Sequence, residues 1–134
     1  MFNIYLYYNE LTTETILKKI CSTFLMNTNS DTDIISFKTL DTFDNIANSD
    51  ISLYFLENQK NLDTLAERIH NKNILNYIVV IVDNPLEVIK AIKPSIRPSG
   101  VIIKPIQKNN INNILNDITN DLKKFYSKKV LKCM

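Results

Sequence analysis

The chain has 134 residues, of which 45% are hydrophobic and 22% are charged, and its formal net charge is +2. These values predict one globular domain with a sizeable core, and a charge so near neutral argues against nucleic acid as the main partner. A single Gly excludes a Gly-rich phosphate-binding loop, and one His with two Cys excludes a Cys/His zinc cluster.

The first half of the chain alternates between strand-like and helix-like apolar patterns. Residues 4–8 form a short apolar and aromatic run that predicts a strand, and Thr12 or Thr13 can cap the helix that follows. This helix has five apolar residues at helical spacing: Ile16, Leu17, Ile20, Cys21 and Phe24. A second strand is predicted at 34–37, and Asp41 is expected to cap a short second helix.

The second half continues the alternation. Apolar runs predict strands at 51–56, 77–82 and 101–103. An amphipathic third helix is predicted from apolar residues at helical spacing: Leu62, Leu65, Ala66 and Ile69. Asn84 and Pro85 open a short fourth helix that stops at Pro94. It carries Leu86, Ile89 and Ile92.

The last helix follows the fifth strand and is long. Its apolar positions are Ile111, Ile114, Leu115, Ile118, Leu122 and Phe125. Residues 127–134 are basic and show no apolar pattern, so we divide the chain into a domain at 1–126 and a C-terminal tail or linker at 127–134. A charge run of this kind is more often solvated than bound to DNA.

This order of elements predicts the fold. Five strands alternate with five helices, and the three later strands are apolar on both faces, as strands between two helical layers must be. Short connections favour right-handed βαβ units. We therefore predict an α/β protein with a (βα)5, flavodoxin-like, doubly wound parallel five-stranded sheet in three α/β/α layers.

Several residues have a structural interpretation. Cys21 is expected to be a small core residue, and His70 a solvent-facing residue at a helix end. Tyr5 and Tyr7 share one face of a strand, which favours packing over base stacking. The sequence has no apolar stretch long enough to span a membrane and no signal peptide, and its two Cys lie far apart, so we expect a cytoplasmic protein.

The C-terminal ends of the predicted strands carry the polar residues of interest, because ligands of such sheets bind there. Strand three is followed by Glu57 and strand five by Lys104, within the run 100–105 (GVIIKP). This spacing resembles the receiver domain of two-component response regulators. The segment 53–57 (LYFLE) resembles the third strand of LytTR-type receivers in particular.

The resemblance assigns a role to each strand-end residue. Glu57 stands at the position of the phosphoacceptor aspartate and Lys104 at that of the invariant lysine. Pro105 is a candidate for a cis peptide bond. The remaining site positions are the acidic pocket, at Tyr8, Asn9 and Glu10, and the two switch positions, at Asp83 and Val101.

These residues depart from the family's catalytic set. Only Glu10 in the acidic pocket is a carboxylate, so we expect Mg²⁺ binding to be lost or weak. Glu57 is one methylene longer than Asp and partly imitates a phosphorylated aspartate in charge and reach. We expect Lys104 to form a standing ion pair with Glu57 and with Asp83. No catalytic residue, metal ligand or cofactor is expected, and the chain is not predicted to be an enzyme.

The sequence therefore favours an atypical receiver domain in bacterial two-component signalling that works without conventional aspartyl phosphorylation. We expect it to be the regulatory half of a transcription regulator, for example one with a LytTR-type output domain. Expected partners are proteins, including a second copy bound through the fourth helix, fifth strand and last helix. DNA contact would need an output domain outside this chain, and no membrane partner is expected.

Two alternatives remain open at this stage. One is a receiver that is phosphorylated on Glu57 or Asp83. The other is a small-ligand-binding or enzymatic domain with the same fold, which a well-formed polar pocket at the strand ends would favour.

Overall fold

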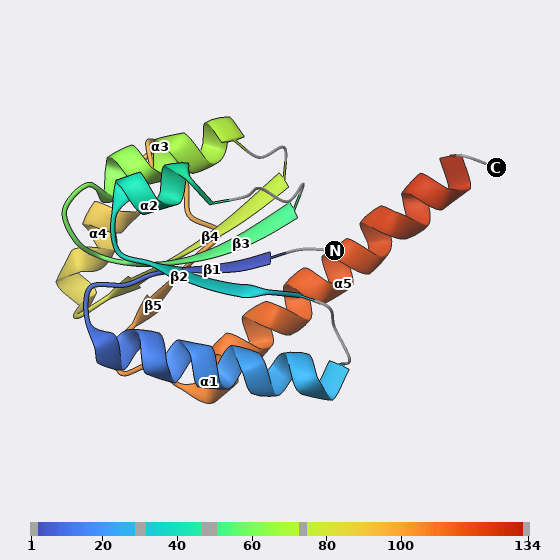
Figure 1. The fold of residues 1–134 in the computed structure, drawn as a ribbon, viewed down its shortest axis with the longest axis horizontal. Coiled ribbons are helices and arrows are strands. Elements are labelled where there is room, and N and C mark those ends of the chain that lie inside the picture. The colour runs from blue at the N-terminus through green and yellow to red at the C-terminus, as the bar shows by residue number, and fades with distance from the viewer. Residues whose placement is uncertain (1–2, 29–31, 47–50, 73–74, 133–134) are drawn as a thin grey trace.

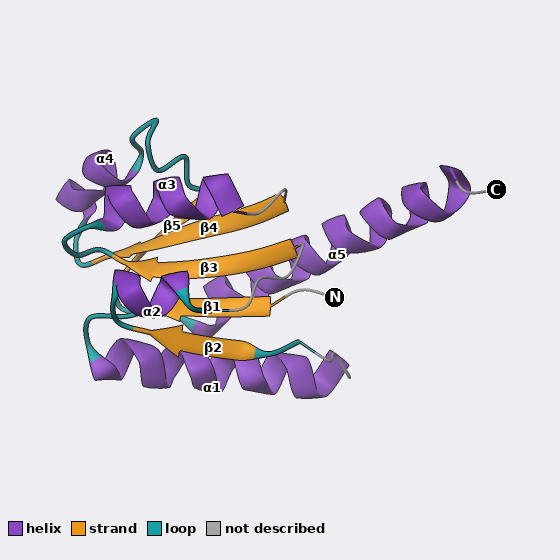
Figure 2. Cartoon of the chain, turned by 45° about the horizontal axis from the view of Figure 1, so that its top comes forward, coloured by secondary structure: helices purple, strands orange, loops and turns teal. Residues whose placement is uncertain are grey.

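A computed structural model describes residues 3–28, 32–46, 51–72 and 75–132, with side chains as far as residue 124. Five parallel strands form one sheet in the order β2-β1-β3-β4-β5, as Figure 2 shows. The strands are β1 (Asn3–Tyr7), β2 (Ile34–Phe37), β3 (Ile51–Glu57), β4 (Leu75–Val82) and β5 (Gly100–Ile103). The predicted fold class is confirmed, and β4 begins two residues earlier than its β-branched run suggests.

Helices cover both faces of the sheet. Helices α1 (Leu11–Thr28) and α5 (Lys108–Lys132) lie on one face (Figure 1). The other face is covered by α2 (Leu40–Asp44), α3 (Leu62–Lys72), the 3-10 turn η1 (Pro85–Glu87) and α4 (Val88–Ala91). The sheet and the two helical layers that cover it therefore form the three layers predicted from the alternating pattern.

Alternation along each central strand divides the core between these layers. On β3, Leu53 and Phe55 face α1 and α5, whereas Tyr54 and Leu56 face the α2–α3 side. All four side chains are fully buried. A strand with period-two side chains can be apolar throughout only if both faces are covered, so this pattern explains why the sequence of β3 is continuously hydrophobic.

The aromatic residues of β1 pack, as the sequence predicts. The ring of Tyr5 stacks on that of Tyr54 with centroids 4.7 Å apart, and Tyr7 packs on Phe37 at 5.1 Å. Cys21 is buried in the core between helix and sheet, and this burial raises the pKa of its thiol to about 12. Cys21 therefore belongs to the hydrophobic core on one face of the sheet, and Tyr5 and Tyr7 belong to the core on the other face.

The structure corrects the ends and faces of three elements. The cap of α2 is Thr39, whose hydroxyl accepts a hydrogen bond from the Thr42 amide, and not Asp41. Helix α1 starts at Leu11, and its buried residues are Thr13, Leu17, Cys21 and Leu25. Ile16, predicted to be buried, is 42% exposed. Strand β5 is an edge strand, so Ile103 is also exposed rather than covered on both faces.

His70 and the C-terminal helix also differ from prediction. His70 is half-buried, and its Nε2 donates to the carbonyl oxygen of Ile96 at 2.7 Å. Helix α5 continues to Lys132 and its last turns extend beyond the sheet (Figure 1). The backbone of residues 127–132 is thus helical where the sequence showed no pattern. Residues 133–134 of the predicted tail lie outside the described residues. Among the residues that the structure describes, no helix is long and apolar enough to cross a membrane.

Candidate functional site

The C-terminal edge of the sheet brings together residues from the ends of three strands. Glu57 ends β3, Asp83 follows β4 and Lys104 follows β5. The sheet's backbone pairing continues past the strand ends, because the Asn58 amide donates to Ile81 O at 2.8 Å and the Lys104 amide to Val82 O at 2.9 Å. These bonds hold the three side chains at the same level of the edge, where the parallel topology predicts that they meet.

The carboxylate of Glu57 is the centre of the cluster. Its Oε1 accepts hydrogen bonds from the backbone amides of Asn9 and Glu10, at 2.5 and 2.8 Å. Its Oε2 accepts from Thr13 Oγ1 at 2.6 Å and from Lys104 Nζ at 2.5 Å. We call these four donors the Glu57 cradle. Each oxygen has two donors, which uses the lone-pair capacity of a carboxylate.

The start of α1 supplies three of the four donors. The carbonyl oxygen of Glu10 accepts from the amides of Thr13 and Glu14, so the helix effectively begins at Glu10. The amides of Asn9 and Glu10 therefore point outward at its amino end, where the helix has no internal acceptor for them. A negative charge is stabilised at this end by the helix dipole. Thr13 lies on the buried face of the first turn and adds its hydroxyl.

Lys104 joins the cluster to β5. Its Nζ lies 2.5 Å from Glu57 Oε2, 2.9 Å from Asp83 Oδ1 and 3.7 Å from Glu10 Oε1. The side chain of Glu57 is 4% exposed and that of Lys104 is 19% exposed, whereas those of Asp83 and Glu10 are more than half exposed. The buried charge pair is thus Glu57 with Lys104, and the two outer carboxylates face solvent.

The surroundings keep both members of this pair charged. Burial raises the pKa of Glu57, but the hydrogen bonds from Lys104, Thr13 and the two amides outweigh it, and the pKa lies below its ordinary value of 4.5. Burial lowers the pKa of Lys104, but the hydrogen bonds and charges of Glu57 and Asp83 outweigh it, and the pKa lies above 10.5. At neutral pH the pair is a carboxylate and an ammonium.

Asp83 is placed by the turn that follows β4. Asn84 caps the 3-10 turn by accepting from the Leu86 amide at 3.0 Å, with Pro85 at the first position, as predicted. Glu87 reaches back to accept from the Asp83 amide at 2.7 Å. These two hydrogen bonds fix the backbone on both sides of Asn84, directly after the residue whose carboxylate contacts Lys104.

The other predicted site residues lie near the cluster with smaller roles. Pro105 follows a cis peptide bond, as expected. Tyr8 is half-buried, with Lys38 Nζ 5.4 Å from its ring centroid, and Val101 is partly buried. Asn9 contributes its backbone amide. Sequence reasoning considered Thr13 only as a helix cap. Its role at the site could have been predicted from its position, because it lies one turn into a helix that starts at the sheet edge beside Glu57.

The residues at this edge do not fit Mg²⁺. This ion needs several oxygen ligands in near-octahedral geometry, but both oxygens of Glu57 face N–H, O–H and ammonium donors. In the described part of the chain, no group of three or more His, Cys, Asp and Glu side chains is arranged to hold a metal ion. The four donors of the Glu57 cradle are instead arranged to hold a carboxylate, which is that of Glu57 itself.

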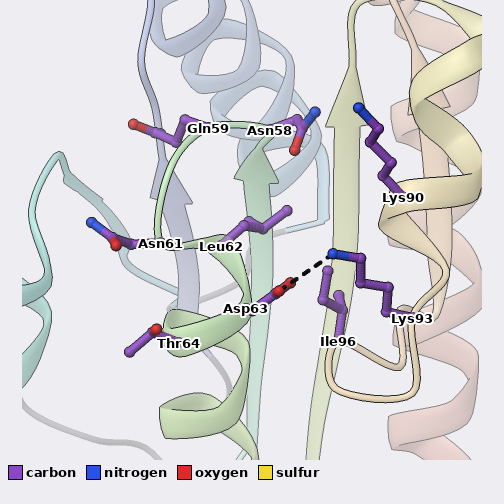
Figure 3. A pocket seen from close by; sticks show the side chains of 9 residues that line it. All are labelled: Asn58, Gln59, Asn61, Leu62, Asp63, Thr64, Lys90, Lys93 and Ile96. Atoms are coloured by element: carbon purple, nitrogen blue, oxygen red, sulfur yellow. Dashed lines mark hydrogen bonds and ion pairs between the residues drawn. The ribbon is translucent and has the colours of Figure 1, made fainter.

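A separate cavity of about 350 Å³ lies between the loop after β3, the start of α3 and α4, and Figure 3 shows its side chains. Asn58, Gln59 and Asn61 line one side, and Lys90 and Lys93 approach from the other. Lys93 Nζ is 3.5 Å from Asp63 Oδ2. The lining contains none of the three clustered residues Glu57, Asp83 and Lys104, so the cavity and the carboxylate cluster are distinct.

Comparisons with known proteins place the fold. No protein-family model matches the chain, and a search of curated proteins finds no match to it. Among solved structures, the chain is similar to the response regulatory domain of mrkE from Klebsiella pneumoniae. The TM-score is 0.65 at 21% sequence identity, over 91% of this chain and 98% of that domain. The chain therefore has a receiver-type fold.

Proposed function

We propose that this chain is an atypical receiver domain of a bacterial two-component response regulator, which signals through protein contacts without conventional aspartyl phosphorylation. The observation that carries the proposal is the Glu57 carboxylate. It stands at the end of the central strand, the position of the family's phosphoacceptor, and it has all its lone pairs directed at donors.

Phosphoryl transfer to a carboxylate places two demands on a site. The attacking oxygen needs a free lone pair in line with the phosphorus atom, and a divalent cation must neutralise the incoming charge. At Glu57, attack would first require loss of a hydrogen bond from the Glu57 cradle. Of the three positions for the acidic pocket, only Glu10 is a carboxylate, and it faces Lys104. Both demands are unmet.

We expect no acyl-phosphate when the chain is incubated with Mg²⁺ and a small phosphodonor such as acetyl phosphate. Intact-mass spectrometry measures this directly, with a conventional receiver treated in parallel as the positive control. A stoichiometric gain of one phosphoryl group would contradict the proposal. Asp83→Asn and Glu57→Ala variants would then assign the product to one of the two carboxylates, which distinguishes the two phosphorylated alternatives.

Four exposed apolar side chains after β4 and on β5 support the interaction role. Leu86 and Ile89 are 83% and 79% exposed, and Ile92 and Ile103 are also exposed. They come from the short helical segment after β4 and from the edge strand β5. Exposed apolar side chains that form a contiguous patch commonly mark a protein–protein contact surface. We propose that they contact a second copy of the chain, in a dimer that includes α5.

Replacing Ile89 with Lys is expected to weaken this self-association at least tenfold, because a charge would be buried in an apolar contact. Met26→Lys is the matched control, since Met26 is equally exposed, at 79%, but lies on α1. Sedimentation equilibrium across a concentration series measures both variants. A wild-type chain that stays monomeric at high concentration, or equal effects of the two variants, would contradict the proposed dimer.

The proposed context follows from this role. The chain would be the cytoplasmic regulatory half of a transcription regulator, with DNA contacted by an output domain outside this sequence, for example one of LytTR type. Its output would depend on dimerisation or partner binding. The chain itself would carry out no catalysis.

A further inference from the structure

The Glu57 cradle consists only of donors, and they come from parts of the chain other than β3. Two are backbone amides before α1, one is the Thr13 hydroxyl and one is the ammonium of Lys104. The donors are divided evenly, two to each oxygen, at 2.5–2.8 Å. This arrangement matches a planar carboxylate, which presents two oxygens with two lone pairs each.

The cradle does not depend on Glu57 for its shape. The amides of Asn9 and Glu10 are fixed by the start of α1, whose buried face packs on the sheet. Lys104 is held by its backbone bond to Val82 O and by Asp83 at 2.9 Å. The start of α1 and Lys104 thus have contacts other than Glu57 that hold them in place.

We infer that the Glu57 cradle is a carboxylate-binding site in its own right, permanently filled by an internal ligand, and that it binds acetate when Glu57 is replaced with Ala. The Ala variant loses one methylene and the carboxylate, which together have the size and charge of acetate. Because Glu57 is 3% exposed, the space that remains is enclosed and lined by the two amides and the hydroxyl that have lost their acceptor, and by Lys104, which keeps its contact with Asp83. Such donors are costly to leave unpaired when they are buried.

The same geometry predicts that the cradle of the intact chain binds no free anion. With the cradle filled by an anion tethered to β3, a free carboxylate or phosphate cannot enter the cradle. This inference is independent of any partner of the proposed receiver, because it concerns only the contacts of one side chain. Its failure would leave the phosphodonor and sedimentation predictions unchanged.

The test is urea unfolding of Glu57→Ala at neutral pH in sodium acetate, with sodium chloride at equal ionic strength as the reference. Once acetate exceeds its dissociation constant, we expect the unfolding equilibrium constant to fall tenfold for each tenfold rise in acetate. The wild type and Glu57→Gln, in which the site is occupied, should respond equally to the two salts. Pivalate, a bulkier carboxylate, should not replace acetate.

Two further arms keep the inference falsifiable. Adding Thr13→Val to the Ala variant removes one donor and should weaken acetate binding severalfold, whereas Thr15→Val, which alters an exposed hydroxyl that bonds Leu11 O, should not. In NMR spectra, the amides of Asn9 and Glu10 should shift as acetate is added. If the Ala variant is unfolded in chloride, folding in acetate supports the inference. An equal response to acetate and chloride overturns the inference, whether the variant is folded or unfolded. Movement of Glu10 or Asp83 into the emptied cradle would give this result.

Discussion

Replacing Lys104 with Met is expected to lower the free energy of unfolding by about 3–5 kcal/mol, the usual cost of removing one partner of a buried ion pair. The variant leaves Glu57 with no compensating cation, although its carboxylate is almost fully buried. It also leaves Asp83 near a second negative charge, because both carboxylates contact the same ammonium. Urea denaturation at neutral pH measures the loss.

Lys93→Met is the matched control for this prediction. Lys93 also pairs with a carboxylate, Asp63 at 3.5 Å, but both side chains are about half exposed, and such pairs contribute at most about 1 kcal/mol. The double variant Glu57→Leu, Lys104→Met should lose less stability than the sum of the two single variants, because it leaves no unpaired buried charge. Equal losses for Lys104→Met and Lys93→Met would contradict the geometry described above.

Replacing Glu57 with Gln is expected to destabilise the fold by about 3 kcal/mol at neutral pH, because the amide group cannot satisfy the cradle. Whichever way the Gln side chain turns, its NH2 group faces groups that can only donate: either the amides of Asn9 and Glu10, or Lys104 Nζ beside the Thr13 hydroxyl. Glu67→Gln, an exposed substitution on α3, should change stability by less than about 0.5 kcal/mol.

The cost of Glu57→Gln should depend on pH in one direction. The pKa of Glu57 is lower in the folded chain than its ordinary value of 4.5. Its contribution is therefore fully present above pH 4.5 and is lost as pH falls through the folded pKa. The difference in unfolding free energy between wild type and variant should be constant at neutral pH and should shrink in acid. A difference that grows in acid would mean that the folded pKa is raised.

The fold was predictable because its periodicities are strong. Strands such as β3 and β4 are apolar on both faces, and helices with clear spacing, such as α3, occur between strands. The face of α1 was less predictable, because Ile16 fits the apolar spacing of the sequence but is exposed in the structure. The actual stripe includes Thr13, a polar residue, because its hydroxyl is paired with a buried carboxylate.

The candidate site was predictable only in part. Parallel topology places Glu57 and Lys104 at the same edge, so their pairing follows from the order of the strands. Two of the four donors to Glu57 are backbone amides, and any residue type except proline at positions 9 and 10 would supply them. The missing carboxylates at positions 8 and 9 were visible in the sequence, but this pair of amide donors has no side-chain signature. It depends on where the first turn of α1 begins.

The most direct test is carbon-13 NMR of the Glu57 side-chain carboxyl, measured before and after addition of Mg²⁺ and then of a phosphodonor. We predict an ionised carboxylate whose titration midpoint lies below pH 4.5 and whose resonance does not change with either addition. A resonance that moves with Mg²⁺, or is replaced by that of an acyl-phosphate, would contradict the assignment of Glu57 as the internal anion that permanently fills the cradle.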